Sequence, residues 1–189
     1  MDIMPKFLKL DIITLQLSYS KKFILKKFLF LIWLSLLGGF FPSLSFAEQS
    51  LVFIEQIGEG NQAEISQSEV GNSASITQIG NSNKASIIQE GELNFAFNFQ
   101  NGIENKSIVS QIGIKNISII SQIGYNNYSY VDIMGNSNKI IEFQIGNNNN
   151  FQLNLVGDSN TIFTSQIGSY LSYSLSYYGS GKTIEIIQY

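Results

Sequence analysis

The sequence contains no histidine, no cysteine and no arginine, and it has little proline and little charge. Its 189 residues include two Pro, and all 11 basic residues are lysines. Only 13% of the residues are charged, against ~25% in an ordinary globular domain. These absences exclude a His general base, a Cys nucleophile, a His/Cys zinc site, a disulfide framework and an Arg clamp on phosphate. Hydrolysis by carboxylates alone and binding of hard cations are the chemistries that remain.

The first 47 residues have the pattern of a secretory signal. Four lysines between positions 21 and 27 precede an apolar run over residues 28–41, and Pro42 then breaks the helix. Ser45 and Ala47 supply the small residues that a signal peptidase reads. The run is shorter than the ~20 residues that span a bilayer. We therefore predict cleavage after Ala47, with a retained membrane anchor as the alternative.

The remaining chain, residues 48–189, has no proline and is acidic. Twelve acidic residues stand against five lysines, which gives a net charge of −7. An acidic chain of this kind is not expected to bind nucleic acid through the phosphate backbone.

One 11-residue repeat organises residues 56–188, and three columns define it. The glycines are Gly58, Gly80, Gly91, Gly102, Gly113, Gly124, Gly135, Gly146, Gly157, Gly168 and Gly179, interrupted only by Glu69. The glutamines two residues earlier are Gln56, Gln67, Gln78, Gln89, Gln100, Gln111, Gln122, Gln144, Gln166 and Gln188. The asparagines three residues later are Asn61, Asn72, Asn83, Asn94, Asn105, Asn116, Asn127, Asn138, Asn149 and Asn160. Ile133, Leu155 and Tyr177 replace glutamine, and Leu171 and Lys182 replace asparagine.

Each unit predicts a strand followed by a four-residue turn. Seven residues alternate with period two, which is the period of a strand. Glycine accepts positive φ in the turn, and asparagine is a common turn residue beside it. Two units form a 22-residue layer of two facing strands, and six layers stack over residues 50–188 about 4.7–4.9 Å apart. The predicted fold is an all-β solenoid, or stacked β-arch, with amyloid-like cross-β packing over a single domain, residues 48–189.

The Asn and Gln columns share the inward parity with a small and an apolar column. Identical amides in successive layers can hydrogen-bond along the stack, as in amyloid, so we predict that these residues form an amide ladder. Turn chemistry alone is the alternative explanation, and it accounts for asparagine but not for glutamine. Asn98 and Glu142 also fall on the inward parity. Because a buried unpaired carboxylate is costly, we expect a local distortion or a register change near Glu142.

The repeat resembles the curlin repeat of curli subunits. Gln56, Gly58, Asn61, Ala63 and Gln67 match every fixed position of that pattern, and the set Gln78, Gly80, Asn83, Ala85 and Gln89 does so again. The resemblance implies a structural subunit of an extracellular functional amyloid fibre of a Gram-negative bacterium, which serves adhesion and biofilm matrix. It also implies other curlin subunits and outer-membrane curli export and assembly proteins as partners. The chain departs from the family in having almost no segment between the signal and the first repeat, which puts recognition by a curli pore in doubt.

Within the family, the residues leave the major subunit and the nucleator open. Glutamine in nearly every half-unit is similar to the nucleator pattern, whereas the terminal Gln188 and Tyr189 are similar to the end of the major subunit.

The ends and one outer face are the predicted interaction surfaces. The end strands, residues 51–56 and 183–188, are apolar and are expected to present unpaired backbone groups to a second copy. One face carries an apolar column that we predict pairs filaments laterally: Phe97, Ile119, Ile141 and Phe163. The alternatives are that the edges are covered in the monomer, and that this face packs inside a globular fold.

No enzyme, cofactor or metal site is predicted, and no small-molecule substrate. The carboxylates that point outward, such as Glu64, Glu90 and Asp132, form no paired constellation. The alternative function is a monomeric secreted β-solenoid adhesin.

Overall fold

The computed structural model describes residues 49–189, which fold into 13 β-strands. The predicted signal, residues 1–47, lies outside the described residues. The strands are β1 (Leu51–Ile57), β2 (Gln62–Gln67), β3 (Ser73–Asn81), β4 (Lys84–Glu90), β5 (Phe95–Ile103), β6 (Lys106–Ile112), β7 (Ile117–Tyr125), β8 (Tyr128–Met134), β9 (Lys139–Asn147), β10 (Asn150–Val156), β11 (Thr161–Ser169), β12 (Ser172–Tyr178) and β13 (Thr183–Gln188).

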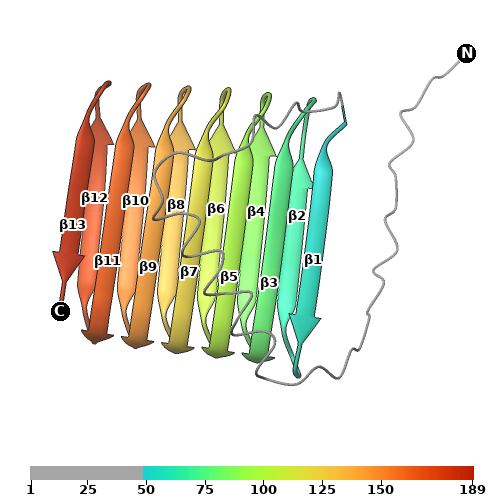
Figure 1. Ribbon diagram of the computed structural model, residues 1–189, viewed down its shortest axis with the longest axis vertical. Helices are drawn as coiled ribbons and strands as arrows, with labels where there is room; N and C mark the ends of the chain where they lie inside the picture. Colours follow the sequence, from blue (N-terminus) through green and yellow to red (C-terminus); the bar gives the residue numbers. More distant parts are fainter. Residues whose placement is uncertain (1–48) are drawn as a thin grey trace, which may run out of the picture.

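The strands form two facing parallel sheets (Figure 1). Sheet A contains the seven odd-numbered strands in the order β1 to β13, and sheet B contains the six even-numbered strands. Each strand pairs with the strand 22 residues away, as Gln78 does with Gln100 on sheet A and Gln67 with Gln89 on sheet B. The arrowheads in Figure 1 show that the strands of sheet A run opposite to those of sheet B. The predicted β-solenoid of six 22-residue layers is confirmed, and β13 adds half a layer beyond the sixth.

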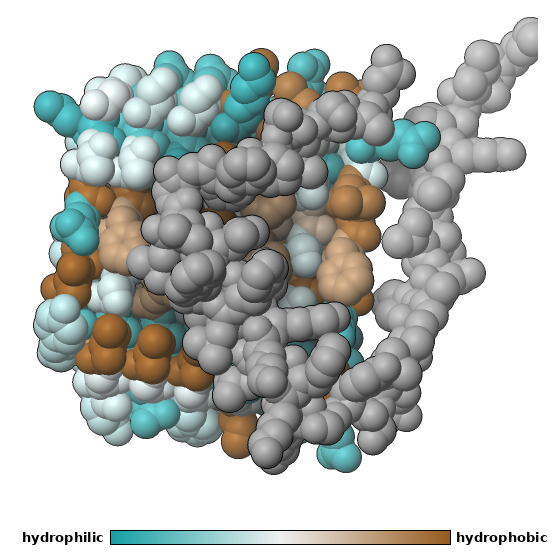
Figure 2. Space-filling view, viewed as in Figure 1, coloured by the Kyte–Doolittle hydropathy of each residue, from teal (hydrophilic) through white to brown (hydrophobic). Residues whose placement is uncertain are grey.

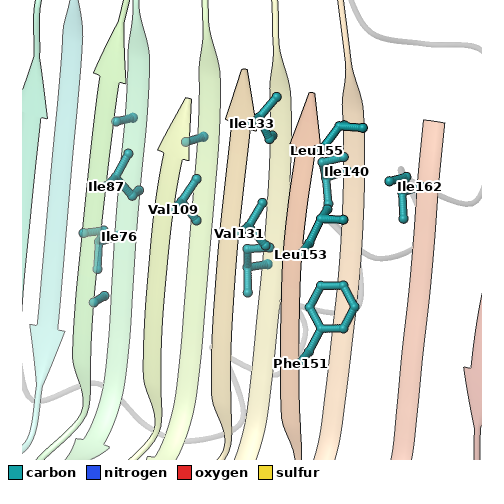
Figure 3. Close-up of a cluster of buried hydrophobic side chains, with 14 residues drawn as sticks. Ile76, Ile87, Val109, Val131, Ile133, Ile140, Phe151, Leu153, Leu155 and Ile162 are labelled. Carbon is teal, nitrogen blue, oxygen red and sulfur yellow. The ribbon is translucent and has the colours of Figure 1, made fainter. Parts of the chain in front are cut away.

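The period-two pattern of the sequence becomes an alternation of buried and exposed side chains. In β6 the side chains of Ser107, Val109 and Gln111 are fully buried, and those between them are not. The apolar members of the inward columns form one core along the stack (Figure 3). The in-register stacking also places like residues in rows across the strands, as the visible part of the surface in Figure 2 shows.

The turns differ between the two edges, which the uniform repeat did not predict. From β3 to β11, each strand of sheet A runs through its glycine and only two residues connect it to sheet B. The return connection from a strand of sheet B to the next strand of sheet A has five residues between β2 and β3 and four residues from β4 onward. The prediction of one four-residue turn therefore holds for one edge of the solenoid from β4 onward and is wrong for the other edge between β3 and β12.

The expected distortion near Glu142 is wrong. Strand β9 pairs without interruption with β7 and β11, and Glu142 is in register with Ile120 and Thr164. Glu142 remains on the inward side, 1% exposed. A hydrogen-bond partner on the facing sheet, described below, lets the carboxyl stay inside without a change of register.

Candidate functional site

A continuous column of seven glutamines runs through the whole of sheet A. In each glutamine from Gln56 to Gln166, Nε2 donates to Oε1 of the glutamine 22 residues later at 2.7–2.8 Å, and Gln188 is the last acceptor. The five inner glutamines are at most 1% exposed. All the donors point toward the C-terminal layers, so the column has a direction.

The equivalent column in sheet B is short. Gln67 donates to Gln89 at 2.7 Å, and Gln89 donates to Gln111 at 2.8 Å. Ile133, Leu155 and Tyr177 occupy the next three positions, because all three replacements in the sequence lie on sheet B. Seven of the ten glutamines therefore form one ladder and three form another.

From Gln67 onward, an amide hydrogen of each glutamine in the two ladders also bonds to a backbone carbonyl of the facing sheet. Gln100 Nε2 donates to the Lys84 carbonyl at 2.9 Å, and Gln122 Nε2 donates to the Lys106 carbonyl at 3.0 Å. Gln111 does the same in the other direction, to the Phe95 carbonyl at 3.1 Å. Within each ladder, a glutamine such as Gln100 or Gln122 thus ties its strand to the next layer and to the opposite sheet at once, so that both hydrogens of a buried amide are bonded.

The asparagines join successive turns. Asn83 Nδ2 donates to the Gly102 carbonyl of the next layer at 2.9 Å, and its Oδ1 accepts from the backbone N–H of Asn105 at 3.1 Å. The same two bonds recur down both edges, as in Asn116 with Gly135 and Asn138. Leu171 and Lys182 replace asparagine in this column, but their backbone N–H groups still donate to Oδ1 of the asparagine in the preceding layer, Asn149 and Asn160. The asparagine column is therefore an inter-layer clamp on the glycine carbonyls.

The glycines are required for two reasons. Gly102 has φ of +139°, in the region that favours glycine. A Cβ on it would overlap the backbone carbonyl oxygen of Gly124 in the next layer, and the same holds for Gly113 against Gly135. The sequence predicts the positive φ but not the close approach, since the approach depends on how the turns stack.

A further turn position was missed by the sequence prediction. The residue two positions after each member of the glycine column has φ between about +50° and +75°, and nine of these residues are not glycine, among them Ser82, Lys115 and Tyr170. The N–H of this residue donates to a carbonyl of the preceding layer, as Ser82 does to Glu59 at 2.8 Å. The abundance of Gly, Asn and Ser at this position was the signal that could have revealed it.

A polar group lies between the sheets near the middle of the stack. Ser129 of sheet B donates its hydroxyl to Glu142 Oε2 at 2.6 Å. Burial raises the pKa of Glu142 from its usual 4.5 to about 8, and the bond from Ser129 opposes that rise in part. Glu142 is therefore protonated at neutral pH.

A second polar residue of sheet A also bonds to the facing sheet. Asn98 Nδ2 donates to the Ser107 hydroxyl of sheet B at 2.7 Å.

The four apolar residues of the predicted lateral face lie in one register on sheet A. They stand on the successive strands β5, β7, β9 and β11, and all are partly exposed. Phe143 extends the column sideways, since its ring centroid lies 5.9 Å from that of Phe163. The carboxylates outside the core are spread along the solenoid, and no group of three metal-ligating side chains occurs among residues 49–189. The described part of the chain also contains no helix long and apolar enough to cross a membrane.

The two ends of the solenoid expose residues that are buried in every inner layer. Val52 and Ile54 of β1 point inward yet are 39% and 38% exposed, whereas Ala74 and Ile76 in the next strand are 2% and 0% exposed. Within the described residues, no donor is assigned to Gln56 Oε1 at one end of the ladder, while Gln188 at the other end accepts from Gln166. The ends are therefore complementary in hydrogen bonding: one has a free acceptor and the other a free donor.

Comparison with known proteins confirms the resemblance that the repeat suggested. A family model described as the curlin associated repeat matches residues 80–113, which include β4, β6 and the whole of β5 between them. No curated protein matches the chain. No solved structure matches it either.

Proposed function

We propose that this chain, in which residues 80–113 match the curlin associated repeat, is a structural subunit of an extracellular amyloid fibre of the curli type. The fibre grows by end-on addition of strands and serves cell adhesion and biofilm matrix. Other curlin subunits, and outer-membrane export and assembly proteins, are its proposed partners.

The observation that carries the proposal is that the strand at each end of the solenoid, β1 or β13, offers an edge to which another strand can be added. Among residues 49–189, β1 and β13 each pair with one strand only, and their inward side chains are partly exposed. A free, flat, apolar edge is a template for another chain. The Gln column of sheet A supports addition in one direction, since its donors all point toward β13.

Export through the secretory pathway is part of the proposal. It rests on the signal pattern in residues 1–47, with residues 48–189 as the mature chain. An acidic chain without cysteine needs no oxidative folding step, which suits an extracellular fibre.

A structural role rather than catalysis also fits the inner surface. The buried polar groups of the solenoid are mostly amides that bond to one another along the stack. The apolar column of sheet A is proposed as the face through which filaments pair side by side.

The test is assembly of residues 48–189, which contain both sheets and their core. Freshly desalted protein is followed by thioflavin T fluorescence, with electron microscopy at the endpoint. A lag followed by fibres, shortened by preformed seeds, supports the fibre subunit, and fibres with almost no lag favour a nucleator within that family. A β-rich protein that stays monomeric for days contradicts the proposal and leaves the monomeric adhesin.

A further inference from the structure

The solenoid has an odd number of strands, so both of its ends are made by the same sheet. Sheet A begins with β1 and ends with β13, while sheet B begins with β2 and ends with β12. Along the stack, sheet A therefore extends half a layer beyond sheet B at each end.

This shape decides how a second copy can be added. If the next copy keeps the same orientation, its β1 pairs with β13 and its β2 lies two strand spacings from β12. That leaves a gap of about 9.5 Å in sheet B. The gap exposes the inward side chains of β12, Tyr173, Leu175 and Tyr177, and leaves a full strand of backbone groups unpaired on each side.

A half-turn about the long axis removes the gap. The strands of the two sheets run in opposite directions (Figure 1), and the 11-residue unit is shared by both. Such a rotation therefore places β1 of the next copy on β12 and its β2 on β13, each parallel to its neighbour. We propose that successive copies in the fibre are related by this half-turn, so that sheet A of one copy continues as sheet B of the next. The inference rests on the proposed fibre function and specifies its junction.

The inward columns match across this junction. Ile184 and Ile186 of β13 meet Ala63 and Ile65 of the next copy, and Leu175 of β12 meets Ile54. These side chains are partly or largely exposed at the free ends, although their counterparts in the inner layers are buried.

The amide ladder also continues, but in the other sheet. Gln188 Nε2 donates to the Ser172 carbonyl at 3.4 Å and keeps a second hydrogen, which every earlier glutamine of sheet A uses for the next layer. Gln67 begins the ladder of sheet B, and its Oε1 is the atom that Gln188 reaches across the half-turn. The long ladder of one copy thus joins the short ladder of the next.

One outward pair identifies the junction by its charge. Across the half-turn, Glu185 of β13 lies beside Glu64 of the next copy, whereas in the unrotated arrangement it lies beside Phe53. Both carboxylates are exposed on the outer surface of their strands. Like charges directly opposite one another in a sheet oppose pairing.

Cysteine pairs test the geometry directly, since the chain contains no cysteine of its own. In the half-turn junction Ile187 lies beside Ser66 of the next copy, and in the unrotated junction it lies beside Glu55. All three side chains are exposed. The variants S66C/I187C and E55C/I187C are assembled under reducing conditions, checked for fibres, oxidised, dissolved and separated on a denaturing gel without reductant. The single variants S66C, E55C and I187C are the controls.

We expect a ladder of covalent dimers, trimers and longer chains from S66C/I187C fibres and mainly monomer from E55C/I187C fibres. A ladder from E55C/I187C instead, or from neither pair while fibres form, overturns the half-turn. Absence of fibres from the unmodified chain overturns the proposed function itself, so the two failures are distinguishable.

A charge cycle provides the second measurement, read as the protein left in solution at equilibrium with fibres at low salt. E64K and E185K each turn the repulsive pair into an attractive one and lower that concentration about fivefold. The double variant E64K/E185K restores a like-charge pair and brings the concentration back toward that of the unmodified chain. Additive effects of the two substitutions would show that positions 64 and 185 do not meet and would overturn the proposal.

Discussion

Sheets A and B are built from the same 11-residue unit, yet their inner surfaces differ. Sheet A keeps its glutamine column from end to end and also carries Asn98, Glu142 and Thr164 in the central inward column. Sheet B has Ile, Val or Leu at every central position, and it replaces glutamine with Ile133, Leu155 and Tyr177. One sheet is therefore held along the stack largely by amides, and the other increasingly by apolar contact.

The unsatisfied polar atoms follow the same division. Among the described residues, four buried side-chain atoms have no hydrogen-bond partner, and all four lie on sheet A: Asn98 Oδ1, Ser118 Oγ, Glu142 Oε1 and Thr164 Oγ1. Sheet B instead supplies hydroxyl partners, Ser107 and Ser129, and the stacked rings of Phe151 and Tyr173, 6.5 Å apart. One repeat can therefore support two kinds of interior, provided that the glycine turns stay in register.

The two sheets should behave alike at their glycines, and substitution of a glycine has the largest expected effect on the free energy of unfolding. Gly102→Ala, at the end of a sheet A strand, and Gly113→Ala, after a sheet B strand, both place a Cβ on a stacked carbonyl. We expect each to lower the free energy of unfolding by about 5 kcal/mol or more. Urea denaturation of the monomer, followed by circular dichroism, measures it.

Gly181→Ala is the matched control. Its φ is +69°, but no atom lies within 4 Å of the added Cβ, so it should cost only about 1 kcal/mol. Equal losses at Gly102 and Gly181 would mean that backbone conformation, and not the close approach of layers, makes glycine necessary.

Glu142→Gln tests the polar interior of sheet A through pH. The folded carboxyl stays protonated until about pH 8, whereas in the unfolded chain it ionises near its usual 4.5. Stability is therefore lost progressively as pH rises from about 4.5 to 8 and is constant with respect to this group outside that window. The loss amounts to about 5 kcal/mol in total.

The glutamine variant should remove that slope and be the more stable protein at pH 8. The measurement is the urea midpoint between pH 4 and pH 9, with Glu92→Gln on the exposed surface as the control. A slope that persists in Glu142→Gln but disappears in the control would contradict the assignment.

Gln122→Leu and Gln111→Leu compare the two ladders directly. Gln122 bonds to Gln100 and Gln144, so leucine leaves an unpaired donor and an unpaired acceptor in sheet A, at a cost of about 3 kcal/mol. Gln111 is the last glutamine of its ladder, since Ile133 occupies the next position of the column. Leu155 shows that leucine fits this column of sheet B. Its replacement should cost about 1 kcal/mol. Equal urea midpoints for the two variants would refute the difference between the sheets.

The smallest effect on stability is expected at the outer face. Phe97→Ser together with Phe163→Ser should leave fibre elongation intact and make the fibre bundles thinner, because the apolar column that pairs filaments is lost. Thioflavin T kinetics and bundle width by electron microscopy measure the two properties. The matched pair on sheet B, Ile88→Ser with Ile108→Ser, should leave bundle width unchanged, and unchanged bundling in the phenylalanine variant would disprove the lateral role of this face.

Much of the fold could be predicted because the repeat fixes a local periodicity. Alternation over seven residues, such as 61–67, determines which side chains share a face, and the constant spacing determines that Gln78 stacks with Gln100. The distortion expected at Glu142 failed because the sequence reasoning considered only neighbours along the column. Its partner Ser129 lies on the facing sheet, and how the two sheets interdigitate is not a property of the repeat.

Spacing along the chain was therefore enough to predict the strands, the inward columns, the 22-residue stacking and the resemblance to curlin repeats. The contacts between atoms of different layers and of different sheets became visible only in the folded molecule. Asn83 meets a glycine carbonyl of the next layer, Gln100 crosses to the backbone of Lys84, and both free ends belong to sheet A. These contacts depend on how closely turns approach and how two sheets face each other, distances that a one-dimensional period does not contain.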